Sequence, residues 1–188
     1  MNTACSHLKK DNQKAAVLFS KYSLLQNKQD CHLLKKDKAR FDCDYVSGLI
    51  QGDGGVSLSF RDPRKRKKGI KYCFHIGQHL NSLDLLVRLK DFFQCGKIQK
   101  VSPTYYRFMV SDLESLLNKI LPHFVAYPLK DEKKDQFNIF SEVCKMVKHK
   151  EHLTEEGFEK IVRIAYKMNM DGKRRKHTME EYLKLVVS

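Results

Sequence analysis

The pattern of apolar and polar residues after the first forty predicts a helix followed by a strand. Residues 45–51 are largely apolar, and Gly48 and Gly52, four positions apart, fall on one face of a helix. The Gly-Asp-Gly-Gly run at 52–55 predicts the end of that helix, because glycine readily adopts a left-handed cap conformation. Residues 56–60 alternate apolar and polar side chains, which is the two-residue period of a strand.

The order of elements then continues through a second strand, a helix and another hairpin. Residues 70–80 predict the return strand, and a helical stripe of apolar residues predicts the helix that follows it. The stripe consists of Leu83, Leu86, Leu89 and Phe93. Residues 97–102 and 105–110 predict two strands on either side of a turn at Pro103.

The rest of the chain predicts helices. A capping box at residues 111–114 opens one that we expect to end at Pro122, because proline cannot donate the backbone hydrogen bond of a helix interior. Residues 132–149 and 154–168 predict two more. A second capping box at residues 178–181 opens the last helix.

The order helix, hairpin, helix, hairpin, helix and helical tail predicts an α+β fold. We expect one four-stranded antiparallel sheet covered by helices on one face (αββαββα), in a domain of residues 41–188. Residues 1–40 are rich in Lys and polar residues and are predicted to form a basic extension. The uncovered sheet face would carry side chains suited to nucleic acid. The positions assigned to it are Ser57, Ser59, Arg61, Lys71, Cys73, His75, Lys97, Gln99, Tyr106 and Arg107.

The charge of the chain indicates the same partner. Lys and Arg number 36 against 22 Asp and Glu, a net charge of +14, which favours a polyanion. A basic run at the tip of the first hairpin would contact phosphates or act as a nuclear localisation signal. It consists of Arg64, Lys65, Arg66, Lys67 and Lys68. The chain lacks an apolar run of about 18 residues, so we expect no membrane span. The six cysteines form no C-x-x-C pair, and we expect reduced thiols.

Residues 46–54, Val-Ser-Gly-Leu-Ile-Gln-Gly-Asp-Gly, resemble the nine-residue LAGLIDADG signature. The match comprises an apolar start, a small residue, Gly48, a Leu-Ile pair, the small Gly52 and a closing Asp-Gly, on a helix that leads into the two hairpins. Two further landmarks fit the family, Phe-His-Ile-Gly-Gln at 74–78 and Tyr-Pro-Leu-Lys at 127–130. Over about residues 40–150, the chain resembles a single-motif LAGLIDADG homing endonuclease.

The resemblance implies a metal-dependent active site. Asp53 stands at the position of the family's metal-binding acid. The backbone carbonyl of Gly52 would be a further ligand of Mg²⁺, an ion that prefers oxygen donors. Gln78 aligns with a residue that organises water near the scissile phosphate. A lysine in the loop before the fourth helix would stabilise charge on the phosphate; Lys130 is our choice, and the spacing also fits Lys133.

The chain contains one such motif, and the resemblance implies that two motif helices pack together. A second copy of the chain would supply the other helix, which predicts a C₂ homodimer. Its interface would be formed by Val46, Gly48, Leu49 and Gly52. A two-fold protein should prefer a pseudo-palindromic DNA target.

The resemblance therefore implies a homing endonuclease that hydrolyses double-stranded DNA at specific sites. Its gene would lie in a group I intron of an organelle genome, with the mitochondrion favoured over the chloroplast. Two alternatives remain on the same fold: an RNA maturase that binds intron RNA, and a DNA-binding protein that does not cut. Asp53 favours the nuclease, whereas Gln51, where family members often carry an acid, leaves room for the alternatives.

Overall fold

The computed structural model describes residues 41–61, 69–168 and 177–187, and within them the predicted α+β fold is confirmed. One antiparallel sheet has the strand order β1-β2-β4-β3, so the two hairpins join through their second strands. The strands are β1 (Gly54–Phe60), β2 (Ile70–His79), β3 (Lys97–Ser102) and β4 (Tyr105–Val110). The predicted extension 1–40 and the basic run 64–68 lie outside the described residues.

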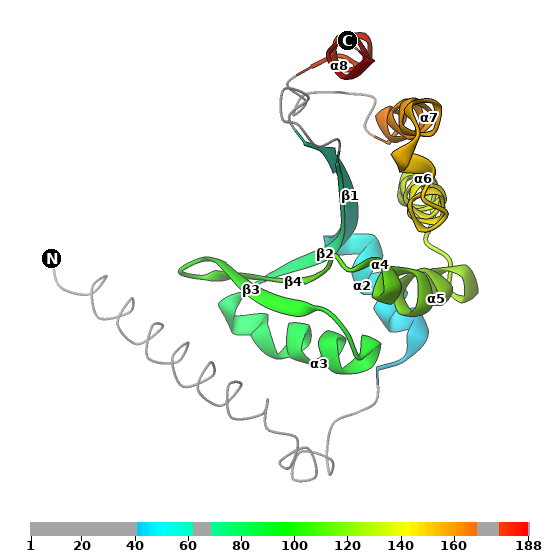
Figure 1. Ribbon diagram of the computed structural model, residues 1–188. Coiled ribbons are helices and arrows are strands. Elements are labelled where there is room, and N and C mark those ends of the chain that lie inside the picture. Colours follow the sequence, from blue (N-terminus) through cyan, green and yellow to red (C-terminus); the bar gives the residue numbers. More distant parts are fainter. Residues whose placement is uncertain (1–40, 62–68, 169–176, 188) are drawn as a thin grey trace, which may run out of the picture.

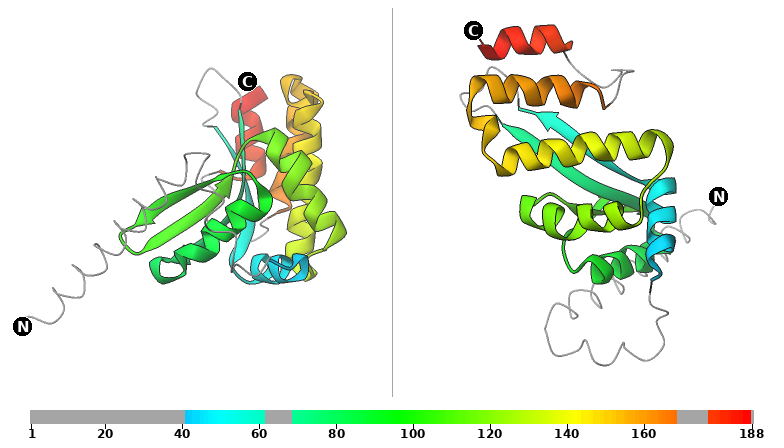
Figure 2. Two further views of the ribbon diagram at one scale, coloured as in Figure 1. Left: turned by 90° about the horizontal axis from the view of Figure 1, so that it is seen from below. Right: turned by 90° about the vertical axis from the view of Figure 1, so that its right-hand side faces the viewer.

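The sheet is bent, and the described helices lie on its convex side, so that none of them covers its concave face (Figures 1 and 2). None of the helices within the described ranges is long and apolar enough to cross a bilayer. The helices are α2 (Cys43–Asp53), α3 (Leu83–Phe93), α4 (Leu113–Ser115), α5 (Leu121–Ala126), α6 (Asp131–Lys148), α7 (Glu155–Tyr166) and α8 (Met179–Val187).

Aromatic and aliphatic side chains join the sheet to the helices. All four residues of the apolar stripe predicted for α3 are buried. Phe93 of this stripe stacks on Phe108 of β4 and meets Phe74 of β2 edge to face, with ring centroids 6.4 and 5.9 Å apart. Burying a side chain of this kind contributes roughly 1.5–3 kcal/mol. Since side chains alternate along a strand, the same packing turns the polar positions of β2 and β4 to the concave side.

The helix that begins after β4 departs from the prediction at Pro122. The expectation that Pro122 ends the helix is wrong, because the chain continues through a π turn at Leu116–Ile120 into α5, with Pro122 in the first turn of α5. A first turn tolerates proline, since the backbone N–H that proline lacks has no helical partner there. The helical segment therefore continues past Pro122 by way of a wider π turn.

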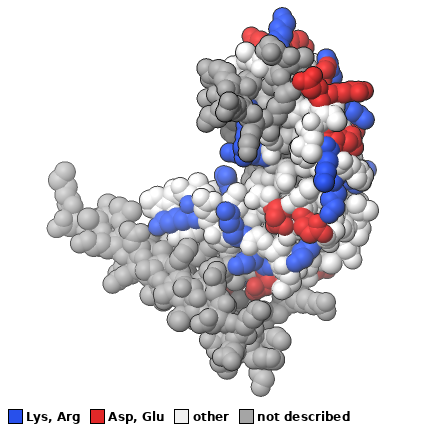
Figure 3. Space-filling view, in the orientation of Figure 1, with Lys and Arg blue, Asp and Glu red and all other residues white. Residues whose placement is uncertain are grey.

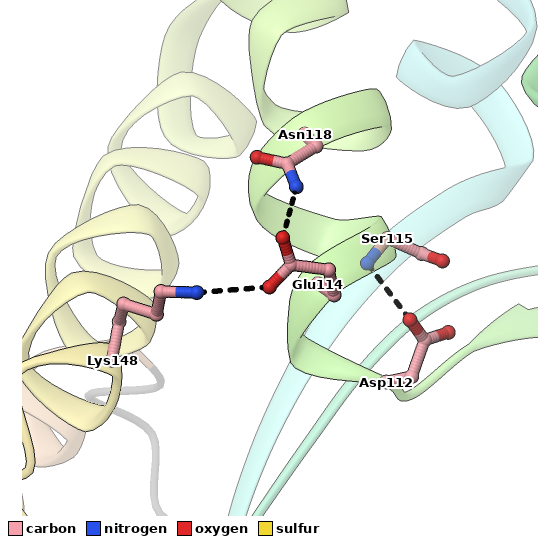
Figure 4. Close-up of polar contacts among 5 residues, drawn as sticks. All are labelled: Asp112, Glu114, Ser115, Asn118 and Lys148. Atoms are coloured by element: carbon pink, nitrogen blue, oxygen red, sulfur yellow. Dashed lines mark hydrogen bonds and ion pairs between the residues drawn. The ribbon is translucent and has the colours of Figure 1, made fainter.

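Polar contacts stabilise the start of this helical segment, and one exposed ion pair links it to α6. Asp112, rather than the serine before it, caps the helix, and its Oδ1 accepts a hydrogen bond from the backbone N–H of Ser115 at 2.8 Å. Glu114 does not close the predicted capping box. It accepts instead from Asn118 and from Nζ of Lys148 on α6, 2.9 Å away (Figure 4). These donors hold the pKa of the Glu114 carboxyl below its ordinary value.

The C-terminal tail packs against the far end of the first hairpin. Helix α8 begins with the predicted capping box, which is confirmed: Glu181 accepts from the N–H of Thr178, and the Thr178 hydroxyl accepts from the N–H of Glu181. Tyr182 is buried against Phe60 of β1, and its hydroxyl donates to the carbonyl of Arg61. The tail therefore supports the hairpin from the helical side.

Candidate active site and nucleic-acid interface

Helix α2 turns one face to the core and leaves another open. Val46 and Ile50 are fully buried, so the prediction that Val46 belongs to a dimer interface is wrong; residues two apart lie on opposite sides of a helix, and Gly48 takes the open side. Gly48 and Gly52 are exposed, and a Cβ on either would meet no described atom within 4 Å. Leu49 is half-buried at the edge of the core. The open strip is therefore backbone at two glycines, which another helix can approach closely.

The C-terminal end of α2 carries the exposed carboxylate of Asp53, which accepts a hydrogen bond from a residue of β2. Gly54 ends the helix and pairs with Ile76 in the β1–β2 ladder. Gln78, two residues farther along β2, consequently lies beside Asp53. Its Nε2 donates to Oδ2 of Asp53 over 2.6 Å. The amide thus fixes one oxygen of a carboxylate that remains exposed to solvent.

The ammonium of Lys133, in the first turn of α6, reaches the end of α2. Its Nζ donates to the carbonyl oxygens of Ile50 at 3.0 Å, Gly52 at 3.1 Å and Gly54 at 2.8 Å. Partial burial lowers the pKa of Lys133, and the charge of Asp53 opposes that shift. Of the two lysines that the sequence left open, the structure brings Lys133 to the carbonyl of Gly52.

Lys130 takes a different place, because its backbone and not its side chain contacts α2. The N–H of Lys130 donates to Oε1 of Gln51 at 3.0 Å, and Nε2 of Gln51 lies 3.5 Å from the carbonyl oxygen of Lys130. The Lys130 residue is exposed at the start of α6. Gln51 therefore ties the motif helix to the loop before α6, a role that the sequence analysis missed, since the two residues are 79 positions apart.

A residue at the middle of α2 anchors the helix to α5 and the loop that follows. The hydroxyl of Ser47 donates to the carbonyl of Tyr127 at 2.8 Å and lies 3.3 Å from Nε2 of His123. The His123 ring packs edge-on against Phe92 and Phe124. Burial lowers the pKa of His123, so the imidazole is neutral at pH 7.

The concave face of the sheet collects the polar strand positions. The register places Ser57 opposite Cys73, and it places Gln99 and Gly77 on the two sides of Arg107. The predicted positions that share this face are Ser57, Ser59, Lys71, Cys73, His75, Lys97, Gln99 and Arg107, with Arg61 following at the end of β1.

Tyr106 does not belong to this face, and its assignment to DNA contact is wrong. Tyr106 is 1% exposed and belongs to the core, because it alternates with Arg107 along β4. Tyr105 takes the concave position instead, and its ring fills the space that a side chain at Gly77 would occupy. Strand alternation was a signal in the sequence that could have identified Tyr105.

Two side chains of β2 on the concave face, His75 and Cys73, are uncharged and lie near the positive charge of Arg107. Burial lowers the pKa of His75, and the positive charge of Arg107 lowers it further. Burial also raises the pKa of the Cys73 thiol. Both side chains are therefore uncharged at pH 7. Figure 3 shows Lys and Arg side chains around the hollow of the molecule, while Asp and Glu gather on the helical side.

The donor atoms at the end of α2 fit a hard divalent cation. The Asp53 carboxylate and the Gly52 carbonyl are oxygen ligands of the kind that Mg²⁺ prefers, and both residues are exposed to solvent. Among the described residues, His, Cys, Asp and Glu side chains form no cluster of three or more that could hold a metal.

Comparisons with known proteins match this architecture. The family model described as LAGLIDADG endonuclease matches residues 46–144. The chain is 33% identical over 129 residues to the probable intron-encoded endonuclease 3 of Neurospora crassa, covering 66% of this chain and 24% of that protein. It is 30% identical over 114 residues to an uncharacterized 50.9 kDa protein in ND4 intron 1 of Podospora anserina, covering 58% and 25%. The chain thus spans about a quarter of the length of these relatives.

Solved structures share the fold. The homing endonuclease I-TnaI superposes with a TM-score of 0.66 at 26% identity, covering 79% of this chain and 98% of that one. The LAGLIDADG homing endonuclease I-GzeII, in complex with its DNA target, gives a TM-score of 0.66 at 28% identity, covering 76% and 48%.

Proposed function

The chain belongs to the LAGLIDADG endonuclease family, and we propose that it hydrolyses phosphodiester bonds of double-stranded DNA at a specific site. One observation carries the proposal: Gln78 holds the exposed carboxylate of Asp53 where the open end of α2 meets the sheet. A relative named as an intron-encoded endonuclease, and a structural neighbour solved with its DNA target, support the same activity.

We assign the ion to Mg²⁺, with Asp53 and the carbonyl of Gly52 as its ligands from this chain. When bound, the ion stabilises charge on the phosphate and lowers the pKa of bound water. Gln78 keeps the Asp53 carboxylate in position through its 2.6 Å hydrogen bond. Lys133 replaces Lys130 as the active-site lysine, because the Lys133 ammonium reaches Gly52.

The partner that completes the site is a second copy of the chain. Gly48 and Gly52 leave a strip of backbone open along α2, and Asp53 follows directly at its end. Pairing two such strips about a two-fold axis would bring the two Asp53 carboxylates together over the DNA. A homodimer of this kind recognises a pseudo-palindromic target.

The concave sheet face would contact that target. Lys71, Lys97 and Arg107 supply positive charge for phosphates and guanine edges, and Gln99 supplies an amide for base edges. We also propose that the gene lies in a group I intron of a mitochondrial genome; a relative named for its place in an ND4 intron supports the intron location. Intron RNA is a second polyanion that the same basic surface could bind.

The test is a search for cut sites by the full chain. Fungal mitochondrial DNA is incubated with the protein and Mg²⁺, and new DNA ends are sequenced; structured intron RNA serves as a competitor. We expect discrete double-strand breaks with wild type and a loss of cutting by several orders of magnitude with Asp53→Asn. The substitution keeps the size of the side chain but removes the charge that holds the ion. Equal cutting by the variant, or RNA binding without any cutting, would refute the nuclease.

A further inference from the structure

All three hydrogen-bond donors of the Lys133 ammonium are in use. An ammonium has three N–H groups, and here they donate to the carbonyls of Ile50, Gly52 and Gly54 at 2.8–3.1 Å. The lysine therefore has no donor left for a phosphate while these bonds stand. A role at the scissile phosphate requires Lys133 to leave at least one of the three oxygens.

The three oxygens lie where a cation is favoured. Ile50 and Gly52 belong to the last turn of α2, whose C-terminal end carries partial negative charge, and Gly54 follows directly as the first residue of β1; the Ile50 carbonyl also accepts from the N–H of Gly54. Asp53 adds a full negative charge at the same place. The Lys133 ammonium offsets both, and its flexible four-carbon stem allows it to move.

Two cations would contact the same one of these three oxygens. The carbonyl of Gly52 accepts from Lys133 at 3.1 Å, and it is also the oxygen assigned above to the divalent ion. An ammonium and a divalent cation on one oxygen would repel each other strongly at such short range. Occupation by the ion and occupation by the ammonium therefore exclude each other.

We propose that Lys133 is a tethered cation that occupies the carbonyl oxygen of Gly52, together with those of Ile50 and Gly54, until a divalent ion displaces it from Gly52, which frees the ammonium for the phosphate. The proposal rests on the proposed function. In the homodimer each subunit would bring one Asp53 carboxylate and one Lys133 ammonium to the two-fold axis. Their charges would cancel, so the pair of helices could assemble before the ion binds.

The test measures metal binding rather than cleavage. Mn²⁺ alone is titrated into the full chain, and free Mn²⁺ is followed by electron paramagnetic resonance. We expect Lys133→Met to bind Mn²⁺ more tightly than wild type, by on the order of tenfold, because a competing charge has gone. Lys134→Met, which removes a charge from the neighbouring exposed residue of α6, should leave the affinity nearly unchanged. Equal or weaker binding by Lys133→Met would overturn the proposal.

A second variant and a second readout cover loss of folding. Lys133→Gln is neutral but keeps two hydrogen-bond donors, and it should also tighten Mn²⁺ binding. In wild type labelled with ¹⁵N-lysine, the ammonium signal that either variant removes should show slow hydrogen exchange, and Ca²⁺ should make this exchange fast. A signal that Ca²⁺ leaves unchanged would contradict displacement. Asp53→Asn separates the two hypotheses. If it leaves Mn²⁺ binding intact, the metal site itself is wrong; if it abolishes binding while the Lys133 variants match wild type, only the tethered cation is wrong.

Discussion

The amide of Gln78 donates to the carboxylate of Asp53 over 2.6 Å, and this bond joins the end of β2 to the end of α2. The two residues lie 25 positions apart and meet because Gly54 pairs with Ile76. The hydrogen bond from the neutral amide gives this exposed carboxylate a fixed orientation.

Gln78→Leu should slow cleavage by roughly 10²-fold or more, because misplacing a catalytic group by about 1 Å costs that much. The change removes the bond to Asp53 without removing the carboxylate, so Mn²⁺ binding should persist in a weakened form. Single-turnover cleavage and Mn²⁺ titration measure the two effects separately. Gln78→Asn, with a shorter amide, is the matched control and should retain part of the rate if it still reaches Asp53. Full activity of Gln78→Leu would show that the contact has no catalytic role.

If the chain forms the proposed homodimer, Gly48→Leu should convert it into a monomer while the chain stays folded. A side chain at Gly48 meets no described atom within 4 Å, so the isolated chain accommodates it, whereas two paired helices would be pushed apart. Light scattering measures the mass, and thermal melting measures the fold. Gly54→Ala is the contrasting variant. Its Cβ would lie 2.7 Å from Cγ2 of Ile50, so we expect a lower melting temperature. A wild-type chain that remains monomeric with and without DNA contradicts the dimer.

Replacing Lys71 and Lys97 by Ala should weaken DNA binding and make it less dependent on salt. Both lysines are exposed on strands whose register places them on the concave face. Each phosphate contact that is lost should reduce the slope of log affinity against log salt concentration by roughly 0.9. Gel-shift titrations at several salt concentrations give the slope. The control replaces Lys145 of α6 and Lys160 of α7, which are both exposed. An equal effect of both pairs would mean that the concave face has no special part in binding.

The stability of the protein should fall as the pH decreases below about 6.5, in part because of His123. Burial lowers the pKa of His123 in the folded state, so the unfolded chain takes up a proton that the folded chain resists. The contribution of this histidine is therefore full above about pH 6.5 and is lost as the pH falls through its folded pKa. The neighbouring charge of Asp44 opposes the shift, and His75 adds to the loss in the same direction.

Denaturant unfolding at about pH 7.5 and about pH 5.5 measures this loss. His123→Gln keeps a polar partner near Ser47 and should reduce the difference in unfolding free energy between the two pH values. His149→Gln, at a side chain that is 72% exposed, is the control and should leave the difference unchanged. A pH dependence that is the same in His123→Gln and wild type would contradict the assignment.

Local pattern determined much of this protein. The apolar stripe of α3 is four residues on one helix face, and the capping box of α8 is a contact between residues three apart. Both depend only on neighbours in the chain, and so both could be predicted. The motif around Gly48 and Asp53 could be recognised for the same reason, because its nine residues are contiguous.

Tertiary structure decided what sequence spacing leaves undetermined. Lys130 and Lys133 are three residues apart in one charged stretch, and only the position of α6 beside the end of α2 brings the Lys133 ammonium to three carbonyls. Val46 belongs to the same motif as Gly48, yet it is buried, because one side of the helix packs against the core. The partners of Gln51 and Gln78 lie 79 and 25 residues away. Which distant groups meet depends on the register of the strands and on the docking of the helices. The free energy that stabilises both comes from contacts throughout the core, so no short segment of the sequence determines them.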